Sequence, residues 1–102
     1  MPYFNFINSI KSKASKKIYQ FHLNAFIQYY QLDSTASIMS FTADELRDKI
    51  VKYFLYKNHF RRSTQSVALA AIKHFCEMND IILNWKKINK FALNSDIPKL
   101  QN

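Results

Sequence analysis

The sequence predicts an all-α, single-domain fold, and three observations indicate it. Glycine is absent from the 102 residues, which argues against the tight primed hairpins that many β-sheet folds need. Apolar residues recur at helical spacing in four segments of the chain. Hydrophobic residues make up 48% and aromatic residues 16% of the sequence, which exceeds what a disordered basic chain carries and suffices for one modest core.

The first predicted helix runs from about residue 15 to residue 30, and Ser15 is placed to cap it. Its apolar stripe consists of Tyr19, Leu23, Phe26 and Tyr30, flanked by Ile18 and Ile27. Because these side chains recur at the spacing of helical turns, we expect one face of the helix to be buried.

The second predicted helix has the clearest start in the chain. Thr42 and Glu45 form a capping box, in which each side chain satisfies the backbone N–H of the other residue. The helix is expected to reach about Tyr56, and Asn58 is placed to end it in a left-handed turn. Its buried stripe consists of Leu46, Ile50 and Phe54, with Val51 and Leu55 beside them.

Two further helices are predicted in the second half of the chain. The third runs from about Ser63 to Met78, and the short fourth begins after Asn84, its cap. The third is expected to bury Val67, Ala71, Phe75 and Met78, with Ala68 and Ile72 widening the face. The fourth is expected to bury Trp85, Ile88 and Phe91.

These helices divide the chain into three parts. Residues 1–10 are expected to form an N-terminal arm or a partly docked first turn, residues 11–92 the helical domain, and residues 93–102 a C-terminal tail. Residues 31–40, rich in Ser and Thr, are expected to be a loop. No stretch approaches the ~20 apolar residues of a membrane span, so we expect no membrane partner and a cytoplasmic location.

Missing residue types exclude several classes of function. Without glycine there is neither a phosphate-binding P-loop nor a dinucleotide fingerprint. A single cysteine excludes a disulfide framework and a Cys-pair zinc site. Cys76 and His74 are two positions apart on a helix and point in different directions, so they form neither a metal site nor a nucleophile–base pair. We expect no metal and no cofactor.

The chain is strongly basic, and the excess is unevenly distributed. Fifteen Lys and Arg residues against seven Asp and Glu residues give a formal net charge of +8. Residues 1–32 carry +4, residues 33–60 are neutral, and residues 61–102 carry +4. A compositional bias of the gene would also produce part of this excess, so the positions of the charges are more informative than their sum.

Three of the four predicted helices begin with cations, where the helix dipole favours carboxylates. The second helix follows the rule with Asp44 and Glu45. The others carry the pairs Lys16 and Lys17, Arg61 and Arg62, and Lys86 and Lys87. Free backbone N–H groups, a cap side chain and two cations suit a phosphate, so these starts predict contacts with the backbone of a nucleic-acid duplex. The alternative is that the long side chains simply extend into solvent.

The polar side of the third helix carries side chains suited to base recognition. Gln65 and Ser66 lie near its start, and Lys73 and His74 extend the same side. Glutamine can pair with adenine through two hydrogen bonds in the major groove. A single polar side chain on a helix is, however, more often simply solvated.

The order of the helices resembles a known family. Ser15, Tyr19, Leu23 and Phe26 open the pattern, the capped second helix follows, and Ser63 and Thr64 lead to the run Ala70-Ala71-Ile72-Lys73-His74-Phe75. This resembles the N-terminal core-binding (SAM-like) domain of tyrosine recombinases, the phage-integrase family, over roughly residues 11–91. The resemblance implies a compact four-helix bundle of two crossed helical hairpins, which forms half of a C-shaped clamp on double-stranded DNA and can touch other recombinase protomers.

The resemblance and the charge pattern together predict binding of double-stranded DNA during integration or recombination, with association with the nucleoid when bound. The candidate DNA-contacting residues are Ser15, Lys16, Lys17, Arg61, Arg62, Ser63, Thr64, Gln65, Lys73, His74, Lys86 and Lys87. The chain is expected to be either a stand-alone regulator or a fragment of a longer recombinase.

The catalytic residues of that family are not expected in this chain. They belong to a separate C-terminal domain, in which a His-x-x-Arg box precedes a nucleophilic tyrosine. His59 and Arg62 match the box, but all six tyrosines precede His59, so we expect a non-catalytic module. Two alternatives stay open: a helix-turn-helix-like transcriptional regulator, which needs a tight turn before its recognition helix, and a basic protein-interaction bundle without affinity for duplexes.

Overall fold

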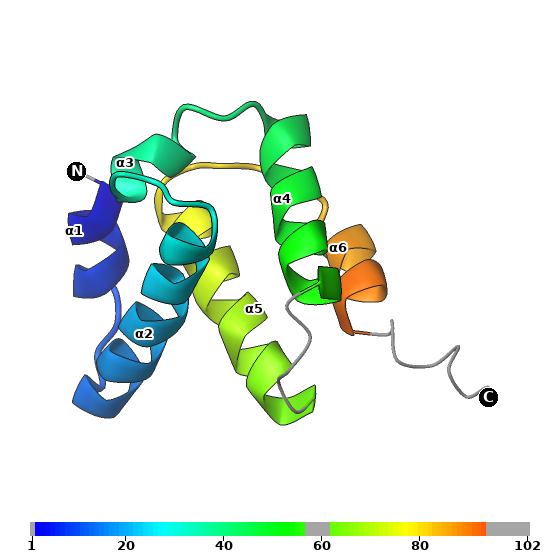
Figure 1. Ribbon diagram of the computed structural model, residues 1–102. Coiled ribbons are helices and arrows are strands. Elements are labelled where there is room, and N and C mark those ends of the chain that lie inside the picture. The colour runs from blue at the N-terminus through cyan, green and yellow to red at the C-terminus, as the bar shows by residue number, and fades with distance from the viewer. Residues whose placement is uncertain (1, 57–61, 94–102) are drawn as a thin grey trace.

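The computed structural model describes residues 2–56 and 62–93, which form six α-helices joined by turns and short connections (Figure 1). In chain order the helices are α1 (Pro2–Asn8), α2 (Lys13–Tyr29), α3 (Thr35–Ile38), α4 (Ala43–Tyr56), α5 (Arg62–Met78) and α6 (Trp85–Leu93). These residues contain no strand. The all-α prediction is confirmed, and α2, α4, α5 and α6 correspond to the four helices that the sequence predicts.

The two longest of these helices, α2 and α5, pack against each other at the centre of the molecule. Both begin at the lower end of Figure 1 and converge towards its upper end, whereas α4 runs the opposite way. α1 packs on α5 and α3, and α6 packs mainly on α4. The most extensive contacts therefore join α2 to α5 and α4 to α6, rather than helices that follow each other in the sequence.

The first residues of the chain form a helix that belongs to the core. Phe6 of α1 is completely buried, and its ring centroid lies 5.9 Å from that of Phe75 in α5. The Asn5 side chain donates a hydrogen bond to Asn79 at 3.1 Å, and the Asn79 amide donates to the Pro2 carbonyl at 3.1 Å. The segment expected as an arm or a partly docked turn is thus a helix held on α5 by aromatic packing and a buried amide.

α2 begins earlier than predicted. Its N-cap is Ser12, whose backbone is extended (φ −83°, ψ 133°) and whose hydroxyl accepts a hydrogen bond from the Ser15 N–H at 3.3 Å. Ser15 therefore lies inside the first turn and is not the cap. Both serines satisfy the preference for a hydroxyl at this position, and the earlier one adds further main-chain hydrogen bonds to the helix.

Two other predicted helix starts are confirmed by their hydrogen bonds. The Thr42 N–H donates to Glu45 Oε1 at 2.9 Å, and the Glu45 N–H donates to Thr42 Oγ1 at 3.1 Å. At α6, the Lys87 N–H donates to Asn84 Oδ1 at 3.1 Å. The segment predicted as a loop between α2 and α4 contains the short helix α3, which Ser34 caps.

The buried face of α5 differs from the predicted stripe. Val67 and Met78, expected in the core, keep 37% and 39% of their surface exposed, whereas Leu69 is buried. α1, α2 and α6 all pack on α5, so its buried face is broader than the single stripe of a surface helix. On α6, Ile88 is buried as predicted, but Phe91 stays half exposed.

Two helices end on residues in the left-handed region of backbone space, where glycine is usual. Gln31 follows α2 with φ 54°, and Asp80 follows α5 with φ 61°. Asp tolerates this region better than most residues because its short side chain can bond locally. Asn58, which the sequence places in such a turn, lies outside the described residues.

Candidate nucleic-acid interface

Two cationic helix starts lie at the same end of the molecule. α2 and α5 both begin at the lower end of Figure 1, and neither has an acidic residue in its first turn. The start of α2 carries Lys11, Lys13, Lys16 and Lys17. Arg62 is the first residue of α5, whereas Arg61 and the side chain of Arg62 lie outside the described part of the structure.

The start of α2 offers main-chain donors to an anion. The Ser12 carbonyl accepts the Lys16 N–H at 2.9 Å, which is the first hydrogen bond of the helix ladder. The N–H groups of Lys13 and Ala14 precede that bond and point out of the end of the helix. Lys13 and Lys17 are exposed and Lys16 is partly exposed, so the donors lie within a positively charged surface.

The acidic residues of the described chain gather towards the opposite end. Asp33 follows α2, Glu77 and Asp80 lie where α5 ends, and Asp44, Glu45 and Asp48 lie in the first half of α4. These helix ends occupy the upper part of Figure 1. Among the described residues, a cluster of four lysines therefore lies at the start of α2, and the acids lie where α2 and α5 end and α4 begins.

The cations at the start of α2 form no ion pair with a carboxylate of the described residues. Within residues 2–56 and 62–93 the ion pairs are those of Arg47, which lies 3.3 Å from Asp44 and 3.3 Å from Asp48. Lys49 is also engaged, since its ammonium lies 4.7 Å from the centre of the Tyr30 ring. Arg47 and Lys49 of α4 therefore make contacts within the fold, whereas the lysines of the α2 start remain available to a ligand.

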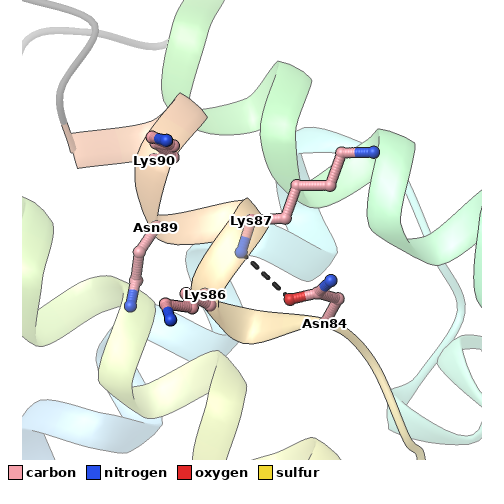
Figure 2. A pocket seen from close by; sticks show the side chains of 5 residues that line it. All are labelled: Asn84, Lys86, Lys87, Asn89 and Lys90. Atoms are coloured by element: carbon pink, nitrogen blue, oxygen red, sulfur yellow. Dashed lines mark hydrogen bonds between the residues drawn. The ribbon is translucent and has the colours of Figure 1, made fainter.

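The third cationic start, at α6, is set apart from the other two. α6 packs beside α4, and its first turn lies at about mid-height in Figure 1. Figure 2 shows the open pocket around this turn, where Lys86 and Lys87 leave the helix on different sides and Lys87 extends towards α4. Of the three starts predicted to contact phosphates, the structure brings two to one end and separates Lys86 and Lys87 from them.

The polar side of α5 is less accessible than the sequence indicates. Gln65, predicted to read bases, is only 7% exposed and lies in the core. His74 is partly buried in the seam with α1, where its Nε2 shares a 2.6 Å hydrogen bond with the Ser9 hydroxyl and its ring lies 5.9 Å from that of Phe6. Packing on α5 from several sides leaves little of Gln65 and only part of His74 accessible to a ligand, and their contacts with DNA stay a prediction.

The other α5 candidates keep contact with solvent. Ser63 is exposed and Thr64 partly exposed in the first turn of the helix, and Lys73 is partly exposed further along it. Ser63 and Thr64 therefore lie at the cationic end, while Lys73 lies towards the end where α5 finishes.

Metal-ligating side chains do not cluster in the described residues. No group of three or more His, Cys, Asp and Glu side chains is arranged to hold a metal ion in this part of the chain. Cys76 is fully buried, and burial together with the charge of Glu77 raises the pKa of its thiol to about 12. His59 lies outside the described residues. None of the described helices is both long and apolar enough to span a membrane.

Sequence reasoning missed Lys11, Ser12 and Lys13 as part of the α2 start. The signal was present as a second serine with a lysine on each side, but Ser15 gave an equally good cap. No protein family, curated protein or solved structure matches the chain.

Proposed function

We propose that the protein binds the phosphate backbone of double-stranded DNA at the end where α2 and α5 begin. The observation that carries this proposal is the cluster of lysines at the start of α2, at the end of the molecule away from the described acids. The described acids lie where α2 and α5 end and in the first half of α4, and the start of α2 combines four lysines with outward-pointing N–H groups.

The physical argument is that this arrangement costs stability unless an anion compensates it. A helix N-terminus carries a partial positive charge, so nearby cations are unfavourable by roughly the 0.3–1 kcal/mol that a carboxylate would contribute there. A duplex supplies closely spaced phosphates, and neutralising them releases condensed counterions. Two helix starts at one end suit such a repeating polyanion better than an isolated anion.

The finer proposal is that the chain is a non-catalytic module similar to the core-binding domain of tyrosine recombinases, able to contact other recombinase protomers. The order of α2, α4, α5 and α6 supports it. α1 and α3 are additions to the four helices of that pattern. That the other four helices form two crossed helical hairpins is part of this proposal.

The experiment is fluorescence anisotropy of a labelled DNA duplex titrated with the full chain across a series of salt concentrations. We expect log affinity to fall steeply with log salt, with a slope of about −0.9 per phosphate neutralised. Replacing Arg61 and Arg62 by Ala should weaken binding to all duplex sequences alike, whereas Lys52→Ala on α4 should change little. Equal losses from both variants would argue against helix starts as the contact. Binding to protein partners alone, insensitive to salt, would favour an interaction bundle.

A further inference from the structure

A groove between α4 and α6 combines exposed apolar side chains with a basic rim. Its apolar lining comes from Val51, Leu55, Tyr56, Ile88 and Phe91. Ile88 is completely buried at its base, whereas Tyr56 and Phe91 keep 70% and 51% of their surface exposed. Large apolar side chains gathered in one groove, rather than scattered singly over a surface, are typical of a binding site for another chain.

The charge of the groove comes from one lysine on each wall. Arg47 and Asp48 also line it, but they pair with each other at 3.3 Å and cancel. Lys52 of α4 and Lys87 of α6 are exposed, and the ion pairs of the described residues include neither. Figure 2 shows Lys87 extending from α6 towards α4. A molecule lying in the groove would therefore meet a positive charge from both sides.

We propose that this groove binds an acidic amphipathic helix of a partner protein. The lining positions of α4 fall at residues 47–48, 51–52 and 55–56, so the groove follows α4 for roughly 14 Å, between two and three helical turns. A partner helix would cover Tyr56 and Phe91 with its apolar face. Carboxylates flanking that face would lie against Lys52 and Lys87, so the groove favours a partner helix with negative charge.

Two other occupants fit this groove less well. A nucleic acid would place phosphates beside Asp48, and Asp44 lies one turn away on the same helix. A second copy of this chain, groove against groove, would bring two lysines from each copy together and repel. The proposal does not depend on DNA binding, because it uses a different surface from the starts of α2 and α5.

The probe is a fluorescein-labelled helical peptide of about 14 residues, with leucines on one face and glutamates flanking them. Its control carries lysines in place of the glutamates. Fluorescence anisotropy with the full chain should show binding of the glutamate peptide and ~10-fold weaker binding of the lysine peptide, because the rim charges then repel it. Equal binding of the two peptides, or no binding of either, would overturn the proposal.

Variants locate the binding surface. Replacing Lys52 and Lys87 by Glu should reverse the preference between the two peptides, whereas replacing Lys16 and Lys17 by Glu alters net charge equally and should leave the preference unchanged. Phe91→Ser should weaken the binding of both peptides. Thermal unfolding of each variant shows whether the variant is folded. The proposal is wrong if duplex DNA displaces the glutamate peptide. It is also wrong if sedimentation shows a dimer that Phe91→Ser dissociates, since the occupant would then be a second copy.

Discussion

α4 and α2 begin with the same kind of cap but with opposite charges. At α4, Thr42 accepts the Glu45 N–H at 3.1 Å, and the carboxylates of the first turn suit the helix dipole. At α2, Ser12 accepts one N–H at 3.3 Å, and the charges that follow are lysines. Folding alone accounts for the start of α4. The charge at α2 is unfavourable for the helix itself, so we attribute it to an anionic ligand.

The largest expected effect is a loss of duplex affinity, which should differ between variants of the α2 start and variants of the α6 start. Replacing Lys13, Lys16 and Lys17 together by Ala should weaken duplex binding more than ~10-fold and reduce the salt slope by up to about 3, one unit for each phosphate that is no longer neutralised. Replacing Lys86, Lys87 and Lys90 by Ala removes the same charge from the separate α6 surface and should have a much smaller effect. Anisotropy titrations of both triple variants provide the comparison, and equal losses of affinity would show that only net charge matters.

The next largest expected effect is a loss of stability, which should differ between the cap of α4 and the cap of α2. Thr42→Ala should lower the free energy of unfolding by about 1 kcal/mol, within a range of roughly 0.5–2, because it removes one half of a reciprocal capping box. Ser12→Ala removes a single longer hydrogen bond and should cost less. Urea denaturation of the two variants measures the difference. A larger loss of stability at Ser12 would mean that α2 depends on its cap as α4 does.

Lys13→Glu should change stability and binding in opposite directions. A carboxylate in the first helical residue of α2 interacts favourably with the dipole and should stabilise the fold by about 0.3–1 kcal/mol at low salt. The same substitution should weaken duplex binding, because it places a negative charge where a phosphate is proposed to lie. Thermal unfolding measures the expected gain in stability, and anisotropy titrations of the same protein preparation measure the expected loss of duplex binding. A variant that loses stability would remove the reason for assigning the α2 cations to a ligand.

The smallest expected effect concerns pH and the buried side of α2. Burial lowers the pKa of His22 from its ordinary value of 6.5, so the unfolded chain takes up this proton more readily than the folded one. The stability from neutral His22 is complete above pH 6.5 and is lost as pH falls below 6.5 through the lowered folded-state pKa. Denaturation at pH 7.5 and 5.5 should show this loss, and His22→Gln should reduce it. An unchanged loss in the variant would assign the effect to other groups.

The sequence predicted best what local contacts decide. The capping box of Thr42 and Glu45, the Asn84 cap and the four long helices follow from residues close together in the chain. The sequence did not predict the helix around Phe6 or the burial of Gln65, because both depend on contacts between distant segments. Local rules also could not choose between Ser12 and Ser15, since each satisfies the same preference.

Of the candidate site, the sequence predicted the cationic starts but not their placement. It could not show that α2 and α5 begin at one end while α6 begins elsewhere, because helix directions are set by packing. His74 illustrates the same limit, since only the fold brings Ser9 within 2.6 Å of its ring nitrogen.

The most direct test of the proposed interface is a titration of isotope-labelled protein with a short DNA duplex, followed through its backbone amide resonances. We expect the largest shifts at the first turns of α2 and α5, at residues 12–17 and 62–66, and none at the capping box of α4. Shifts centred on α4, or no shift at the start of α2 at saturating duplex, would contradict the assignment of these helix starts to phosphate binding.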